Sequence, residues 1–146
     1  IEELKDSAQI AIPNDPTNEG RALILLENNG LIKLKDNSGL EATLKDIESN
    51  PKNIEFKEVE AAQLPRTLDD VDASVINTNY AIEAGLDLTK DALLSEGKES
   101  PYANILVVRP EDEKNENLIK VLKALQSDEV KSFIEKKYGG AVVPAF

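Results

Sequence analysis

The sequence contains no cysteine, histidine, methionine or tryptophan. Without cysteine and histidine it cannot form disulfides, thiolate or imidazole metal sites, or Ser–His and Cys–His nucleophilic pairs. Carboxylates, lysine and tyrosine are the side chains left for proton transfer. The composition therefore predicts that the chain is not an enzyme, and it implies no metal and no cofactor.

Basic residues and long apolar runs are also scarce. The 146 residues include 28 acidic and 17 basic side chains, and the net charge of −11 is the wrong sign for binding nucleic-acid phosphates. The longest apolar run, Ala22 to Leu26, is far shorter than the roughly 20 residues of a membrane-spanning helix. With 40% hydrophobic residues the chain can bury a core. We expect a globular protein with no nucleic-acid partner.

Short apolar segments alternate with helical patterns along the whole chain. Such alternation predicts an α/β fold with a largely parallel sheet flanked by helices. The predicted strands are residues 9–13, 31–35, 54–59, 72–77 and 104–109, and the predicted helical segments are residues 18–29, 43–49, 61–70, 80–84, 115–126 and 128–138.

An arginine lies at an unusual place in the first strand–turn–helix unit. The turn that begins at Asn14 leads into a helix with Arg21 close to its start. The unpaired N–H groups of a helix start disfavour a cation unless an anion is near. Either Glu19 or a ligand supplies that anion, and a solvated Arg21–Glu19 pair is the more common case. A guanidinium beside helix N–H groups also suits a carboxylate ligand.

Asparagines follow the ends of two predicted strands. Asn14 comes after the first strand, and Asn77 ends the 72–77 strand. Ligands of parallel sheets bind beyond the carboxyl ends of strands, and an amide offers both a donor and an acceptor. A single asparagine at a strand end more often belongs to a turn. Together with Arg21, the two predict a site for a small anionic or zwitterionic ligand.

Several longer motifs carry a family resemblance: Ala11 to Asn18 with Gly20-Arg21, Asn50 to Asn53, Gln63 to Arg66, Val75 to Ala81, and Lys98 to Asn104. In this order they resemble the methionine-binding lipoproteins, the substrate-binding subunits of bacterial methionine ABC importers. The resemblance covers essentially the whole chain. It implies a two-lobed, periplasmic-binding-protein-like (type II) fold that closes on methionine, L or D, or on a methionine-containing dipeptide.

The same resemblance implies site residues, partners and a location. Arg21 would bind the substrate carboxylate, and Asn77 and Asn104 would hold its polar backbone groups. Weaker candidates near the cleft are Asn14, Asn18 and Tyr80. The partners would be an ABC permease and its ATPase subunit. The parent protein would lie outside the cytoplasm in the cell envelope, held by a lipid anchor that this chain lacks.

The resemblance also predicts how the chain is divided. Residues 1–103 correspond to the second lobe, and residues 104–146 correspond to a strand and two helices that return to complete the first lobe. Most of the first lobe is expected upstream of Ile1, so ligand binding by this chain alone would be impaired. The strand at residues 105–108 would lack its sheet, and we expect it to pack elsewhere or to cause self-association.

Three alternatives remain open from the sequence. The parent could bind another amino acid or a dipeptide, because the missing lobe would hold the discriminating residues. A small acidic α/β enzyme could use a carboxylate pair such as Asp69 and Asp70. The chain could also be a surface-exposed interaction module.

Overall fold

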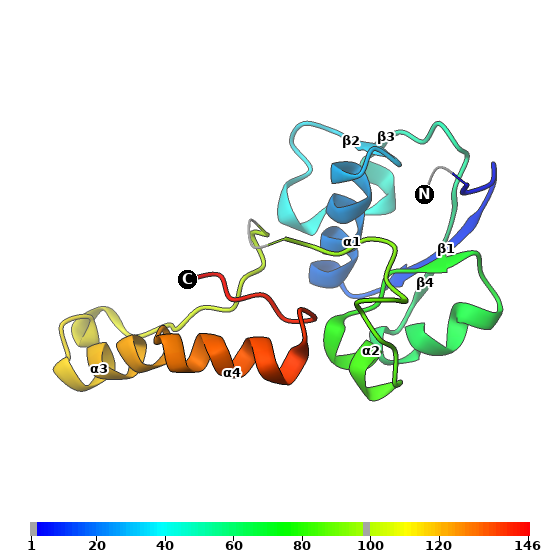
Figure 1. Ribbon diagram of the computed structural model, residues 1–146. Helices are drawn as coiled ribbons and strands as arrows, with labels where there is room; N and C mark the ends of the chain where they lie inside the picture. Colours follow the sequence, from blue (N-terminus) through cyan, green and yellow to red (C-terminus); the bar gives the residue numbers. More distant parts are fainter. Residues whose placement is uncertain (1–2, 98–99) are drawn as a thin grey trace. The chain divides into compact units, whose positions relative to one another are not determined.

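The computed structural model describes residues 3–97 and 100–146 of the chain (Figure 1). These form two compact units, a first that extends to Ser95 and a second that runs from Glu96 to Phe146. Each unit is treated by itself below. Lys98 and Glu99, at the start of the last sequence motif, lie outside the described residues. The lobe boundary between residues 103 and 104 stays a prediction.

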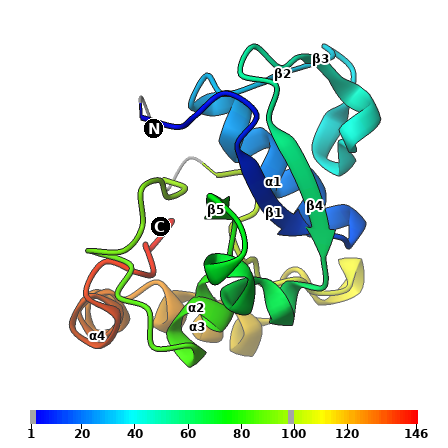
Figure 2. The same cartoon turned by 90° about the vertical axis from the view of Figure 1, so that its right-hand side faces the viewer.

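A parallel three-stranded sheet forms the centre of the first unit. Strand β1 (Gln9–Pro13) lies between β4 (Glu55–Val59) and β5 (Ala73–Ser74), as Figure 2 shows. Gln9 is opposite Glu55, and Ile10 is opposite Ala73. Residues 10–13 are all buried, as expected for a central parallel strand. The predicted α/β class with a parallel sheet is confirmed, although β5 is much shorter than the predicted 72–77 strand.

Helix α1 (Pro16–Asn28) follows β1 directly and packs on it. The Asp15 side chain caps the helix by accepting a hydrogen bond from the Asn18 backbone N–H at 3.1 Å. Gly30, with φ of 72°, reverses the chain after the helix, and the Leu31 N–H then donates to the Leu26 carbonyl at 3.0 Å. These local signals explain why the predicted helix at residues 18–29 is confirmed to within two residues.

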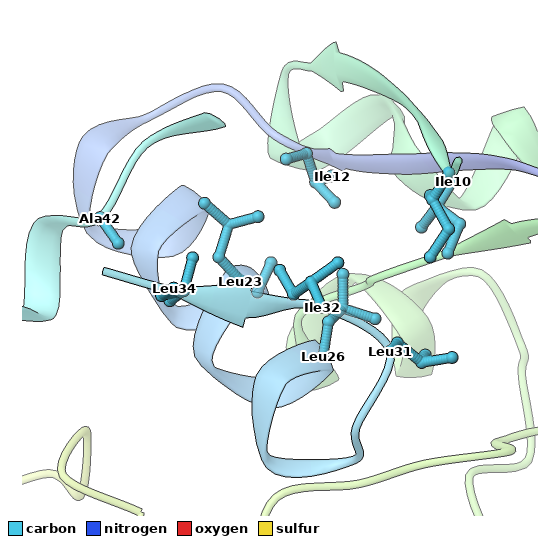
Figure 3. Close-up of a cluster of buried hydrophobic side chains, with 10 residues drawn as sticks. Ile10, Ile12, Leu23, Leu26, Leu31, Ile32, Leu34 and Ala42 are labelled. Carbon is cyan, nitrogen blue, oxygen red and sulfur yellow. The ribbon is translucent and has the colours of Figure 1, made fainter. Parts of the chain in front are cut away.

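The hydrophobic core lies between β1 and α1. Figure 3 shows Ile10 and Ile12 of β1 facing the side chains of Leu23 and Leu26 on α1. Ile12 and Leu23 are each 0% exposed. Other members of the cluster are Ala22, Leu31, Ile32, Leu34, Ala42 and Ile54.

A smaller antiparallel sheet joins β2 (Lys33–Leu34) to β3 (Ile47–Ser49). The predicted helix at residues 43–49 is therefore wrong in its second half. Asp46 closes a capping box with Thr43, which allows one 3-10 turn, η2 (Leu44–Asp46), after η1 (Gly39–Glu41). From Ile47 the chain is extended because it pairs with β2, and an ion pair between Lys33 and Glu48 crosses the two strands.

Short helical segments connect the remaining strands of the first unit. The 3-10 segment η3 (Ala61–Asp69) contains Pro65 and follows β4, as the pattern at residues 61–70 predicts. Helix α2 (Thr78–Glu83) follows β5 and begins two residues before the predicted start. Both segments place their first residues just beyond the carboxyl end of a parallel strand.

The second unit consists of extended chain and helices. The 3-10 turn η4 (Pro110–Asp112) is followed by α3 (Glu116–Leu125) and α4 (Asp128–Tyr138). Asn115 and Ser127 cap the two helices, and Gly139 ends α4 in the left-handed conformation. Both helices agree with the sequence prediction because their caps are local signals.

The predicted C-terminal strand at residues 104–109 is not formed. Ile105 is 80% exposed and Val107 is 75% exposed. A strand requires a neighbour for its backbone hydrogen bonds, and the segments that follow in this unit are helical. Leu106 and Val108 line a shallow groove with Leu118, Ile119 and Leu122 of α3. None of the described residues of this unit is buried.

Candidate ligand-binding site

Five of the six predicted site residues lie in the first unit. Asn14 is exposed directly after β1, and its backbone N–H donates to the Val59 carbonyl of β4 at 3.0 Å. Asn18 and Arg21 lie in the N-terminal half of α1 and are half-buried, and Tyr80 is a half-buried residue of α2. These positions gather at the carboxyl end of the parallel strands, where ligands of such sheets bind.

The sixth residue, Asn104, lies in the second unit. It is exposed within extended chain that follows a small turn, in which the Tyr102 N–H donates to the Ser100 hydroxyl at 3.2 Å. Its role in a site therefore stays a prediction.

The first unit brings Asn18 and Asn77 into direct contact. Asn77 Nδ2 donates to Asn18 Oδ1 at 2.8 Å, although the residues are 59 positions apart. Asn18 Nδ2 in turn donates to both carboxylate oxygens of Asp15, at 3.0 Å each. We call the side chains of Asp15, Asn18 and Asn77 the amide relay. It links the turn after β1 to the turn after β5.

Asn77 has an unusual environment for a residue before a helix. It is the N-cap of α2, with φ of −64° and ψ of 139°, yet its side chain makes no capping hydrogen bond. Its Oδ1 is buried and has no hydrogen-bond partner among the described residues. Leaving a buried acceptor unpaired costs about 1–3 kcal/mol. A buried acceptor of this kind can receive a hydrogen bond from a water molecule or from a ligand.

Glu19, two residues before Arg21, makes a structural hydrogen bond to another segment of the first unit. Glu19 is 6% exposed, and its carboxylate accepts a hydrogen bond from the Leu44 N–H at 3.1 Å. Burial raises the pKa of the Glu19 carboxyl above its ordinary value, and the Leu44 hydrogen bond opposes this rise. The acid thus ties α1 to η2.

Gly20 holds the same part of α1 in close contact with the following loop. A Cβ on Gly20 would lie 2.3 Å from the Leu40 carbonyl oxygen and 3.0 Å from the Ala42 nitrogen. Only glycine allows this approach, which places Arg21 at a fixed position. Gly20 belongs to a motif that carries the family resemblance, but the sequence alone does not reveal its contact with the loop.

Asp15 is not among the predicted site residues, although it belongs to the turn from which the predicted helix starts. The signal was present, since Asp15 precedes Asn18 by three residues, which is the spacing of a capping box. That spacing predicts the hydrogen bond between the Asp15 side chain and the Asn18 backbone N–H, but not the contact between the two side chains. It does not predict that Asn77 joins them.

Other site types have little support in the described part of the chain. Among residues 3–97 and 100–146, no group of three acidic, histidine or cysteine side chains is arranged to hold a metal ion. Asp69 and Asp70, the pair considered for an enzyme, are both exposed. Within those same ranges, every helix is too short or too polar to cross a bilayer.

Polar side chains beyond the carboxyl ends of a parallel sheet are the arrangement in which α/β binding proteins hold their ligands. Comparison with known families specifies the class of protein further. Residues 1–146 match the family model described as NlpA lipoprotein, and the chain belongs to this family. The family consists of binding proteins, so the prediction that the chain is not an enzyme is confirmed.

Individual relatives carry related descriptions. The D-methionine-binding lipoprotein MetQ of Escherichia coli K12 is 50% identical over 145 residues, covering 98% of this chain and 54% of the relative. MetQ of Salmonella typhimurium LT2 has the same identity, aligned length and coverages. The chain therefore spans about half the length of the curated relatives it matches.

Solved structures agree with the fold. A nutrient binding protein from Burkholderia cenocepacia, bound to methionine, has a TM-score of 0.83 and 51% identity over 100% of this chain and 62% of that one. The methionine-binding protein MetQ has a TM-score of 0.78 and 50% identity over 98% of this chain and 59% of that one. The predicted resemblance to methionine-binding lipoproteins is confirmed.

Proposed function

We propose that this chain is the second-lobe part of the substrate-binding component of a bacterial ABC importer for methionine. The names of the MetQ relatives and the methionine-bound Burkholderia structure support the ligand. A periplasmic substrate-binding protein of an ABC transporter from Coxiella burnetii is 50% identical to this chain. It supports the role in an ABC importer. The lipoprotein family supports a location in the cell envelope, outside the cytoplasm, with a lipid anchor on the full-length protein.

The observation that carries the proposal is the unpaired Asn77 Oδ1 at the end of the amide relay. Its neighbour Asn18 is on the same helix as Arg21, three residues earlier. An amino acid carries both a carboxylate and an ammonium group. In this proposal Arg21 binds the carboxylate, while Asn77 and Asn104 hold the polar backbone groups, and Asn14, Asn18 and Tyr80 lie around them.

Capture would use two lobes that close on the ligand by a hinge motion. The ATPase subunit of the importer would supply the energy, and the binding protein would pass methionine to the permease without chemical change. One lobe alone leaves a large part of the ligand in water. We therefore expect the 146-residue chain to bind methionine more weakly than a full-length protein that contains it.

Calorimetric titration tests the ligand and the two-lobe arrangement together. L-methionine, D-methionine and a panel of other amino acids are titrated into the full-length protein and into the 146-residue chain. Methionine should bind the full-length protein best. Preference for another amino acid would favour the alternative specificity, and equally tight binding by the short chain would contradict the need for a second lobe.

An arginine variant tests the assigned residue. Arg21→Ala in the full-length protein should weaken methionine binding by about 2–5 kcal/mol if the guanidinium pairs with the buried carboxylate. The matched control is Arg66→Ala, because Arg66 is exposed and contacts the Gln63 side chain in η3. Equal affinities for the two variants would refute the role of Arg21.

A further inference from the structure

The amide relay has a direction that follows from its chemistry. The carboxylate of Asp15 only accepts hydrogen bonds, and it receives two from Asn18 Nδ2. Asn18 must therefore turn its NH₂ group toward Asp15 and its carbonyl oxygen toward Asn77. Asn77 must then donate from its own NH₂ group, and its Nδ2 does donate to Asn18 Oδ1 at 2.8 Å. Each amide orientation is thus determined by the previous one.

The last member of the relay is left with an acceptor. Because Asn77 Nδ2 is used by Asn18, the free end of the amide is Oδ1, which has no partner among the described residues. This oxygen would ordinarily accept a backbone N–H of α2, since asparagine is a strong N-cap. It makes no such bond. The relay therefore reserves a buried acceptor that helix capping does not use.

We propose that Asp15 is a positioning residue that sets the polarity of the ligand site through Asn18 and Asn77. The position next to Asn77 Oδ1 then accepts a ligand group that donates hydrogen bonds, such as the ammonium of an amino acid. A ligand with a bare oxygen acceptor there is rejected, because two acceptors would face each other. This inference rests on the proposed function and adds the selection of α-amino over α-keto acids.

The side chain of Asp15 has two tasks that can be separated. It caps α1 through the Asn18 backbone N–H, and it orients the Asn18 side chain. Asp15→Asn retains the cap, since asparagine is as good an N-cap as aspartate. The new amide can present either its oxygen or its NH₂ group to Asn18. The whole relay can then reverse, which would leave Asn77 Nδ2 as the free end.

The test compares methionine with 4-methylthio-2-oxobutanoate, which has a ketone oxygen in place of the ammonium group. Both are titrated into the full-length wild-type protein and the D15N variant. The affinity for methionine divided by that for the keto acid should fall by about tenfold or more in the variant, because the Asn77 NH₂ group of the reversed relay donates a hydrogen bond to the ketone oxygen. A loss of affinity that is equal for both ligands would indicate a merely structural role and would refute the proposal.

A matched control uses the capping box at the start of η2. Asp46 accepts hydrogen bonds from the Thr43 N–H and hydroxyl at 2.9 and 2.8 Å. Asp46→Asn makes the same acid-to-amide change away from the relay. The affinity ratio should be that of the wild type. A similar fall in this variant would show that the effect is not specific to Asp15.

A ligand-free measurement separates the relay from the proposed function. In the NMR spectrum of the wild-type chain, the side-chain NH₂ groups of Asn18 and Asn77 should each give a single, exchange-protected pair of signals. In D15N these signals should broaden or double. Unchanged signals would refute the relay, whereas failure of the wild-type protein to bind methionine would refute the proposed function.

Discussion

The two units of the chain contain similar apolar segments, but one is buried in a sheet and the other is exposed. Residues 10–12 of the first unit lie in β1 and are at most 2% exposed, whereas Ile105 and Val107 of the second are 80% and 75% exposed. β1 pairs with β4 and β5, while the 104–109 segment has no strand beside it among the described residues of its own unit. An apolar run becomes a strand only where neighbours satisfy its backbone and cover its side chains.

The largest effect is expected for a substitution that tests the difference in burial between the two units. Leu23→Ala removes a side chain that is 0% exposed in the core of the first unit. It should lower the free energy of unfolding by about 2–5 kcal/mol, from lost burial and a residual cavity. The matched change in the second unit is Leu125→Ala, where the side chain is 48% exposed. Its cost should be under about 1 kcal/mol.

Urea unfolding of both variants, followed by circular dichroism, makes the comparison. Similar losses for Leu23→Ala and Leu125→Ala would mean that the second unit is as well packed as the first. That result would contradict the contrast between them.

Close packing in the first unit can be tested at Gly20. Gly20→Ala places a Cβ 2.3 Å from the Leu40 carbonyl oxygen, and backbone on both sides must shift. We expect a loss of about 1–3 kcal/mol in the free energy of unfolding, and weaker ligand binding because Arg21 moves with the helix. Asn28→Ala, at an exposed position of the same helix, is the control. A neutral Gly20→Ala would show that the contact with the loop is not tight.

The exposed segment of the second unit should promote self-association of the 146-residue chain. Exposed apolar side chains and unpaired strand backbone favour contact between copies. Replacing both Ile105 and Val107 with threonine should weaken this association by about tenfold or more. Sedimentation velocity over a range of concentrations measures it. Leu93→Thr serves as the control, because Leu93 is 76% exposed in the first unit. A chain that stays monomeric without any substitution would refute the expectation.

Local signals made the helices predictable. Asp15 and Pro16 mark the start of α1, and Ser127 and Gly139 mark the two ends of α4, all within a few residues of the helix they limit. The strands were less predictable because their formation depends on distant partners. The sequence pattern predicts a helix at residues 47–49, although β2 holds them extended.

Some features of the candidate site were likewise predictable from local patterns, and others depend on the folded chain. The strand ends and the helix start predict Asn14, Arg21 and Asn77 as site residues because these residues lie beside recognisable elements, whereas Asn18 is implied only by the family resemblance. The contact between Asn18 and Asn77 depends on the register of β1 with β5, which no local pattern contains. The direction of the amide relay requires the distances to Asp15 as well, so only the folded chain reveals it.

The smallest expected effect concerns the buried charge of Glu19. Burial raises its pKa above the ordinary value of 4.5, so the folded state holds the proton more tightly than the unfolded state. Stability from this group is present below the unfolded pKa and is lost as the pH rises through the folded pKa. Glu19→Gln keeps an acceptor for the Leu44 N–H and should raise the free energy of unfolding at neutral pH by less than about 1 kcal/mol. The exposed Glu41→Gln controls for the lost charge. Urea unfolding as a function of pH should show the advantage of Glu19→Gln vanish on acidification, and an advantage that grows instead would contradict the burial of this charge.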